Sequence, residues 1–261
     1  MEAATKSAAS ELRSLLQQHN KTEKHIGYHI LPERLNAIFT DDKDRNKYTF
    51  YERERFAFFC DNVDFKSKRV LDIGCNIGYF LFGFLDIGAK NVTGYEGKLS
   101  CGQYLNKAIQ ITGEEKRFDF HNEYLDFQSI DGKYDVTFLL NVLHHLGDDY
   151  GNQSLDIASA KKLMMEQLNA LRSHTSTLIF QLGFNWKGNR NVCLFEHGTK
   201  AEMIQYITEG TRDHWDIKNI GIAQRVGDGI VYAPVSDSNI ERDDSMGEFL
   251  NRPIFVLQSK G

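Results

Sequence analysis

The sequence predicts a Rossmann-like, doubly wound α/β fold with a mainly parallel seven-stranded sheet and an antiparallel C-terminal edge. Three observations support this fold class. Short apolar runs alternate with segments of helical periodicity between about residues 69 and 182. A turn that carries Gly74 and Gly78 joins the first apolar run to the first of these helices. The chain has 261 residues, 41% of them hydrophobic, which is enough for one large α/β unit with additions.

A helical N-terminal extension is expected to occupy residues 1–66. Leucines at helical spacing predict a helix over residues 7–18, and the same pattern recurs at 32–39. A polar run at 41–47 predicts a loop, and the aromatic and charged segment 48–60 predicts a further helix.

Residues 67–261 are expected to form the main domain. Before residue 183, we expect strands and helices in the following places: strands at 69–73, 91–95, 118–121, 134–140 and 177–182, with helices at 78–85, 100–111 and 157–171. Beyond residue 183 we expect long loops that bind a ligand, a helix near 200–207, and extended segments at 217–223, 229–232 and 254–258. Such sheets bind ligands outside the carboxyl ends of their strands.

The composition of the chain indicates which classes of partner, metal site and location to expect. The formal net charge is -5, whereas a nucleic-acid-binding protein usually carries a basic face, so we expect no nucleic-acid partner. The four cysteines form no C-x-x-C pair, which argues against a zinc site or a disulfide framework, and we expect no metal. The N-terminal residues lack the order of a signal peptide, and the apolar stretch 79–85 is too short to span a bilayer. We therefore expect a cytoplasmic protein with no membrane role; a homodimer stays open.

The turn after the first strand has an unusual pattern. A dinucleotide-binding turn would have glycines at positions 74, 76 and 79, but this chain has Asn76 and Tyr79. Asp72 stands at the carboxyl end of the strand, where a carboxylate is costly unless a partner compensates it. A cationic ligand would be such a partner, and an NAD-dependent enzyme is disfavoured.

This turn, residues 69–80, resembles motif I of the class I S-adenosylmethionine-dependent methyltransferases, whose cofactor carries an ammonium and a sulfonium. Glu96 ends the second strand at about the separation expected of a ribose-binding carboxylate. The resemblance extends to residue 182, and it implies adenine contacts after the third strand, an Asn beside the cofactor after the fourth, and a lid before the first strand. The cofactor residues expected on these grounds are Tyr51, Asp72, Gly74, Asn76, Gly78, Glu96, Gly97, Asn122, Glu123 and Asn141.

Two adjacent histidines are candidates for a catalytic base. Methyl transfer from a sulfonium is an in-line displacement, so a base is needed only when the acceptor must lose a proton. In the resembled family the histidines after the fourth strand approach the methyl group, and His144 or His145 would suit an oxygen acceptor. The alternative is that one of them caps the loop or fills the helix–strand junction.

Acceptor recognition is expected from loops outside the common core. Cations suit a phosphorylated or carboxylated acceptor, although any single one is also typical of a solvated surface. The residues expected to bind acceptor are Trp186, Lys187, Arg190, His197 and Arg225, and the neighbouring cations Lys200, Arg242 and Arg252 belong to the same group.

The favoured function is O-methylation of a small polar acceptor such as a sugar, nucleotide-sugar or phosphorylated metabolite, as in small-molecule biosynthesis. Two alternatives remain. The core is also similar to the enzyme that carboxymethylates the tRNA wobble uridine, and a non-catalytic S-adenosylmethionine-binding protein would need the same cofactor residues.

Overall fold

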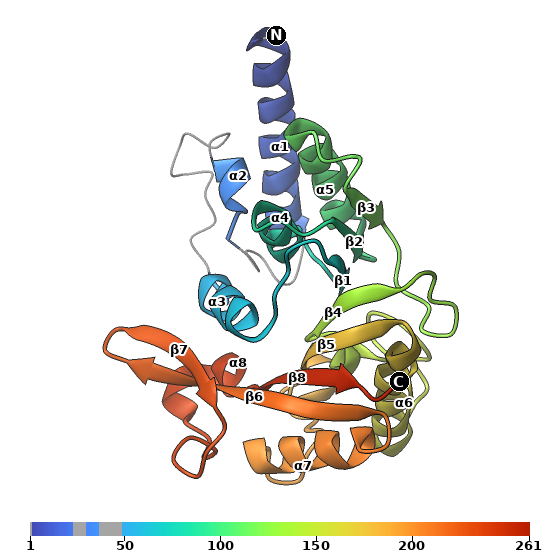
Figure 1. Ribbon diagram of the computed structural model, residues 1–261, viewed down its shortest axis with the longest axis vertical. Coiled ribbons are helices and arrows are strands. Elements are labelled where there is room, and N and C mark those ends of the chain that lie inside the picture. The colour runs from blue at the N-terminus through green and yellow to red at the C-terminus, as the bar shows by residue number, and fades with distance from the viewer. Residues whose placement is uncertain (1, 23–29, 37–48) are drawn as a thin grey trace. The chain divides into compact units, whose positions relative to one another are not determined.

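The computed structural model describes residues 2–22, 30–36 and 49–261 (Figure 1). These residues divide into two compact units. The first comprises Met1–Phe56 and Asp64–Leu125, and the second comprises Ala57–Val63 and Asp126–Gly261. Helix α3 (Glu52–Asn62) contributes residues to both units.

The first unit contains three parallel strands in the order β3-β2-β1. Its elements, in chain order, are α1 (Glu2–Thr22), α2 (Glu33–Asn36), β1 (Arg69–Ile73), α4 (Tyr79–Asp86), β2 (Asn91–Tyr95), α5 (Leu99–Thr112) and β3 (Phe118–His121). Helix α1 packs along α5 and buries Leu12 and Leu16, as the leucine spacing predicts. Because the strands are parallel, the carboxyl ends of β1, β2 and β3 lie at one edge.

The second unit contains five strands in the order β4-β5-β8-β6-β7. Strands β4 and β5 are parallel, whereas β8 pairs antiparallel with both β5 and β6. The strands are β4 (Tyr134–Leu140), β5 (Thr175–Gln181), β6 (Trp215–Val226), β7 (Gly229–Pro234) and β8 (Ile254–Ser259). The helices are η1 (Leu143–His145), α6 (Ile157–Ala170), η2 (Leu171–Ser173), η3 (Trp186–Gly188), α7 (Lys200–Thr211), η4 (Asp244–Met246) and α8 (Gly247–Leu250).

The predicted fold class is confirmed, with one correction to the strand count. The described residues contain eight strands rather than seven. The segments expected to be extended already number eight, one for each observed strand, so the predicted total of seven was too low by one. Strand β7 pairs with β6 in a hairpin that ends with the pair Val226 and Gly229. Gly227 adopts a φ of +57° in the connecting turn, a conformation that glycine reaches at little cost. The remaining strands lie within about two residues of their predicted positions.

The N-terminal segments agree with the prediction in part. Helix α3 begins at Glu52 and not at residue 48, because hydrogen bonds between Glu52 and the residues just before it cap the helix at this point. The Glu52 carboxylate accepts hydrogen bonds from the Thr49 hydroxyl (2.7 Å) and the Phe50 amide (2.9 Å). The predicted loop at 41–47 and the end of the helix predicted at 32–39 lie outside the described residues. The boundary at residue 66 stays a prediction.

Each unit has its own apolar core. In the first, Phe65 stacks on Phe84 with ring centroids 4.4 Å apart, and Phe56 packs on the same ring. In the second, Phe59 meets Phe138 edge to face at 5.0 Å. Among the residues that the structure describes, no helix is both long and apolar enough to cross a membrane.

Candidate functional site

The turn between β1 and α4 has the backbone that its sequence predicts. Gly74 and Gly78 adopt φ values of +79° and +78°, and Asn76 adopts +50°. A Cβ atom on Gly78 would lie 2.6 Å from a methyl carbon of Leu105, so no larger residue fits there without movement. The Gly74 amide donates to the Tyr95 carbonyl at 2.8 Å, which ties the turn to the end of β2.

Asp72 is a buried carboxylate with a strongly perturbed acidity. It is 4% exposed at the carboxyl end of β1, directly before this turn. Burial raises the pKa of Asp72 to about 7, the buried Arg55 cation opposes the shift, and the Glu96 carboxylate adds to it. A cationic ligand at this place would remove much of the cost of the ionised form.

Glu96 follows the end of β2 and is held by the backbone. Its Oε2 atom accepts a hydrogen bond from the Asn76 amide (3.0 Å), and its Oε1 atom accepts one from the Lys98 amide (2.9 Å). The two bonds therefore fix the orientation of the carboxylate.

The ends of β2 and β3 form a close-packed corner. Asn122 donates from Nδ2 to the Glu96 carbonyl at 2.7 Å, so its side chain supports the backbone next to the acid. A Cβ atom on Gly97 would lie 2.3 Å from the exposed Tyr124 ring, so a larger residue there would displace that ring. Glu123 is exposed, with Oε1 3.8 Å from a ring nitrogen of His121. Sequence reasoning did not single out Tyr124 as a site residue.

Tyr51, the expected lid residue, lies immediately before α3. It has a φ of +58°, and its amide donates to the Thr49 hydroxyl oxygen at 3.0 Å. Its side chain is half-exposed. The same helix contributes Arg55, whose guanidinium lies 5.0 Å from the centre of the Phe80 ring. Arg55 is a charged neighbour of Asp72 that the sequence did not reveal, because only the fold brings it within range of that carboxylate.

In the second unit, Asn141 belongs to a buried polar network. Its Nδ2 atom donates to Gln181 Oε1 (2.9 Å), and its Oδ1 atom accepts from Arg252 (2.8 Å). Arg252 is 9% exposed and also pairs with Glu248 at 2.6 Å. The charge of Arg252 is therefore paired inside the second unit, and its expected part in binding the acceptor stays a prediction. Glu248 and Arg252 are four residues apart in the sequence, although Arg252 lies beyond the end of α8 at Leu250.

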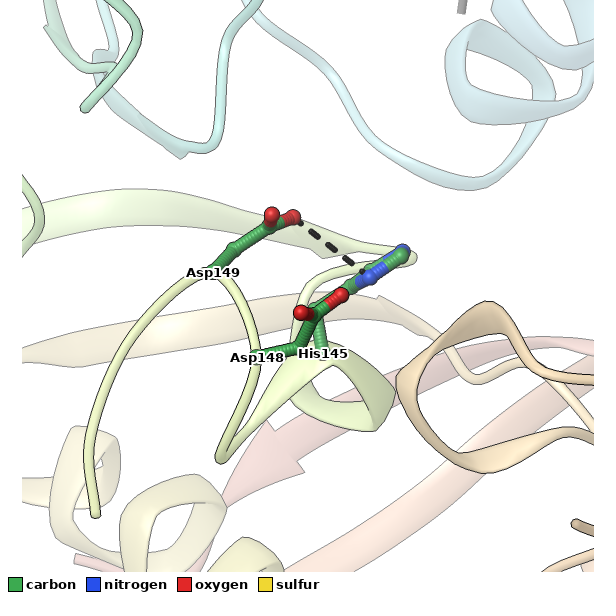
Figure 2. A group of neighbouring side chains, drawn as sticks. All are labelled: His145, Asp148 and Asp149. Atoms are coloured by element: carbon green, nitrogen blue, oxygen red, sulfur yellow. Dashed lines mark ion pairs between the residues drawn. The ribbon is translucent and has the colours of Figure 1, made fainter. Parts of the chain in front are cut away.

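The two histidines occupy different environments. His144 is 2% exposed, and its Nδ1 atom accepts a hydrogen bond from the Gly183 amide at 3.2 Å. It thus fills the junction, as the alternative interpretation of the pair predicts. The His145 side chain is 17% exposed, and its Nδ1 atom lies 3.4 Å from Asp149 Oδ2 (Figure 2). Of the two side chains, that of His145 is the more exposed, and its catalytic role stays a prediction.

The loop after β5 brings two of the predicted acceptor residues close to His145. The Trp186 indole donates to the Leu146 carbonyl at 2.8 Å. The Lys187 ammonium lies 4.3 Å from the centre of that indole and 3.3 Å from the Gln153 carbonyl. A Cβ atom on Gly188 would lie 3.4 Å from His145 Cε1, so this loop is in contact with the imidazole.

The other predicted acceptor residues are distributed over the second unit. Arg190 is exposed on the same loop. His197 is exposed just before α7, where its backbone amide donates to the Glu202 carboxylate at 3.0 Å. Arg225 is exposed on β6 near the hairpin turn. Their roles stay predictions.

Two further cations of the expected group are structural. Lys200 is buried, and its ammonium donates to the carbonyls of Asn239 (3.0 Å) and Glu241 (2.7 Å). Arg242 donates to Asp244 and to the Gly198 carbonyl. Both therefore hold loop backbone in place, and their expected part in binding the acceptor stays a prediction.

The comparisons with known proteins support the motif assignment. No family model matches the chain. It is 28% identical over 120 residues to a tRNA U34 carboxymethyltransferase of Nautilia profundicola, covering 45% of this chain and 37% of that protein. It is 33% identical over 84 residues to the Helicobacter pylori protein of the same name, covering 31% of each. The chain thus spans only about a third of the length of these relatives.

The fold is also that of a solved methyltransferase. A crystal structure of WbdD, described as a bifunctional kinase-methyltransferase, superposes with a TM-score of 0.58 at 14% identity. That match covers 95% of this chain and 46% of WbdD.

One expectation from composition is wrong. The acidic net charge argued against a nucleic-acid partner, yet the curated relatives are named for action on tRNA. A net charge describes the whole surface and does not exclude a local basic face. The chain has the Rossmann-like fold of the class I S-adenosylmethionine-dependent methyltransferases, the family that its glycine turn and acidic strand ends resemble.

Proposed function

We propose that this protein is an S-adenosylmethionine-dependent methyltransferase, with its cofactor held by the first unit. The observation that carries the proposal is the combination of Asp72 and Glu96 at the ends of adjacent strands, beside a turn that requires glycine. The buried Asp72 matches the ammonium of the cofactor, and Glu96, whose carboxylate is oriented by two backbone amides, is assigned to the ribose hydroxyls. Tyr51, Asn76, Gly97, Asn122 and Glu123, all in the first unit, are its further proposed contacts, and the expected role of Asn141 stays a prediction.

The cofactor would supply an activated methyl group. An in-line displacement needs positioning and the exclusion of water, and a base only for an acceptor that loses a proton. We assign that base to His145 because His144 is buried and its Nδ1 atom is engaged by a backbone amide. His145 would take the proton of an acceptor hydroxyl.

For the acceptor, we propose a small polar molecule with a phosphate or carboxylate group, methylated on oxygen. Support comes from the aromatic and cationic loop after β5, where Trp186, Lys187 and Arg190 follow one another closely in the sequence and the first two lie at the His145 loop. His197 and Arg225 would complete recognition.

A tRNA is the second candidate acceptor, and a specific observation favours it. The sequence similarity to the tRNA U34 carboxymethyltransferases reaches 33% identity, although it covers only 31% of each chain. The transferred group would then be carboxymethyl or methyl, delivered to a uridine of the tRNA.

Calorimetric titration with S-adenosylhomocysteine tests the cofactor assignment without knowledge of the acceptor. Binding that is lost or weakened in the Asp72→Asn variant is the expected result. A folded protein that binds neither S-adenosylhomocysteine nor S-adenosylmethionine would contradict the proposal. Binding without methyl transfer to any acceptor would instead indicate a non-catalytic cofactor-binding protein.

Transfer of a radiolabelled methyl group distinguishes the acceptors. The protein is incubated with labelled S-adenosylmethionine and either bulk tRNA or a low-molecular-weight cell extract. Label in the extract, lost after phosphatase treatment of that extract, supports a phosphorylated small acceptor. Label in tRNA assigns the chain to RNA modification and rules out the small-acceptor proposal. A parallel reaction with a carboxymethyl donor identifies the group that is transferred.

A further inference from the structure

We propose that the amino ends of strands β1, β2 and β3 form a basic face of the first unit that binds the phosphate backbone of RNA. We call it the strand-entry face, and its cations are Lys66, Lys68, Arg69, Lys90, Lys116 and Arg117. The inference rests on the second candidate acceptor of the proposed function, a tRNA, and adds the surface that would hold that molecule.

The parallel order of the strands brings these cations together. Strands β1, β2 and β3 all begin at the same edge, because each runs parallel to its neighbour. The Lys90 amide donates to the Lys68 carbonyl at 2.8 Å, and the Val92 amide donates to the Arg117 carbonyl at 2.8 Å. Because neighbouring strands lie about 4.8 Å apart, the backbones of the three strand entries fall within about 10 Å of one another.

Four lysines of this face make no ion pair in the part of the chain that the structure describes. They are Lys66, Lys68, Lys90 and Lys116. The first, third and fourth of these side chains are exposed, and the second is half-buried. Elsewhere in the same unit, by contrast, Lys107 pairs with Glu11. The lysines that lack a carboxylate partner are therefore gathered at one edge of the sheet.

The carboxylates at this edge are fewer than the cations, and two of them are already neutralised. Asp86 and Glu114 both pair with Arg34, and Glu114 also pairs with Arg117. The remaining carboxylates of the strand entries are Asp64 and Glu115. The strand-entry face thus keeps an excess of positive charge, although the whole chain has a net charge of -5.

The side chains suit contacts with phosphates and not with bases. A lysine ammonium is a point charge on a flexible stem, so it can follow phosphate oxygens without a fixed geometry. Phe65, the aromatic residue of the loop before β1, is 2% exposed and offers no ring on which a base could stack. Such a face would position an RNA without reading its sequence.

The face lies at the edge opposite to Asp72 and Glu96. Strand β1 has five residues, so at about 3.3 Å per residue the two edges are roughly 17 Å apart. A single domain that binds double-stranded RNA contacts a duplex over about 16 base pairs, which is longer than this separation. One tRNA molecule can therefore contact the strand-entry face with a stem while another part of it reaches the carboxyl ends of the strands.

A structural role is the alternative that the test must separate. Helices α4 and α5 end at this edge, and cations near the last turn of a helix stabilise it through the helix dipole. That role predicts a lower thermal midpoint of unfolding when the lysines are neutralised. It predicts no change in RNA binding.

The experiment compares the unchanged protein with two triple variants. The face variant is Lys66→Gln/Lys90→Gln/Lys116→Gln, which changes one exposed lysine at each strand entry. The matched control is Lys162→Gln/Lys218→Gln/Lys260→Gln, which removes the same charge from exposed positions of the second unit. Circular dichroism verifies folding, and affinity for S-adenosylhomocysteine should stay within about twofold in both variants.

The main readout is the fluorescence anisotropy of end-labelled bulk tRNA, titrated with protein between about 50 and 200 mM salt. In the face variant, the dissociation constant at the lower salt should rise by roughly tenfold to a hundredfold. The slope of its logarithm against the logarithm of salt concentration should fall by about 2 to 3, because three phosphate contacts are lost. The control variant should keep both quantities, with a dissociation constant within about twofold.

Four outcomes would overturn the proposal. They are equal weakening in the two triple variants, an unchanged salt slope in the face variant, a lowered thermal midpoint with unchanged tRNA binding, and no tRNA binding by the unchanged protein at about 50 mM salt. In the last case, binding to phosphatidylglycerol vesicles that the face variant loses would assign the face to an anionic lipid surface.

The binding titration requires no turnover, so the surface and the acceptor can fail separately. If the face variant loses tRNA binding but no tRNA is methylated, the tRNA acceptor has failed and the strand-entry face stands. If tRNA is methylated and the face variant keeps the KM for tRNA of the unchanged protein, the face has failed and the tRNA acceptor stands.

Discussion

Replacing Asp72 with Asn should make the free protein more stable and its cofactor binding weaker. The carboxylate is 4% exposed, and burial, opposed by Arg55 and reinforced by Glu96, raises its pKa from 3.8 to about 7. At 1.36 kcal/mol per pKa unit, this rise corresponds to a cost of about 4 kcal/mol for the ionised form in the folded protein. The asparagine side chain has the same shape and carries no charge.

The sign of the pH dependence follows from proton binding. Between about pH 4 and pH 7 the folded protein keeps on Asp72 a proton that the unfolded chain releases. Stability of the unchanged protein therefore falls as pH rises through this window, and the variant lacks this loss. At pH 8 we expect Asp72→Asn to raise the free energy of unfolding by about 2 to 4 kcal/mol. The difference should approach zero at pH 4.

Binding should respond in the opposite direction. Loss of a charge-assisted hydrogen bond to the ligand ammonium costs about 1.5 to 3 kcal/mol, or roughly 10-fold to 150-fold in the dissociation constant. In the unchanged protein, affinity for S-adenosylhomocysteine should fall by up to about tenfold per pH unit below pH 7, because Asp72 must lose its proton to bind a cation. The variant should show no such dependence.

The assays are denaturant unfolding at pH 8 and pH 4, and calorimetric titration with S-adenosylhomocysteine across the same range. Glu115→Gln, at an exposed position in the same unit, controls for the loss of one negative charge. If Asp72→Asn were less stable than the unchanged protein at pH 8 and bound the ligand with the same dissociation constant, both the buried-charge argument and the assignment of Asp72 would be refuted.

Three further substitutions test the structural roles of site residues. His144→Ala should lower the free energy of unfolding by about 2 to 4 kcal/mol, because it leaves a cavity and an unpaired Gly183 amide. The same change at His145 should lower the free energy of unfolding by less than about 1 kcal/mol. Equal losses in the two variants would contradict the different burial of the two side chains. Arg252→Ala should cost about 2 to 4 kcal/mol at pH 7 in urea unfolding. Burial acts to raise the pKa of Glu248, but the hydrogen bonds and the charge of Arg252 hold this pKa below its usual value. The loss of stability in Arg252→Ala should therefore become smaller as pH falls below 4.5 and Glu248 is protonated. Gly78→Ala should lower the free energy of unfolding by about 1 to 3 kcal/mol, because residue 78 has a φ of +78°, and it should abolish binding of S-adenosylhomocysteine. An unchanged thermal midpoint of unfolding would show that the turn adapts to the alanine without strain.

The sequence by itself determined the order of strands and helices and the chemistry of the turn after β1. These features depend on local signals. Apolar runs, helical periodicity and glycines that permit positive φ act over a few residues, so strands such as Asn91–Tyr95 agree with their predicted bounds. The positions of Asp72 and Glu96 at strand ends follow from the same local patterns.

The tertiary structure decided which polar groups meet and which are buried. Two adjacent histidines look alike in sequence, but Gly183, 39 residues away, engages one, while Asp149 pairs with the other. Arg252 reads as a surface cation until the fold places it beside Asn141, 111 residues earlier. Burial and pairing depend on neighbours that are distant in the chain, and a buried charge persists only where such a neighbour compensates it. Local patterns carry no information about those partners, so only the folded chain could assign them.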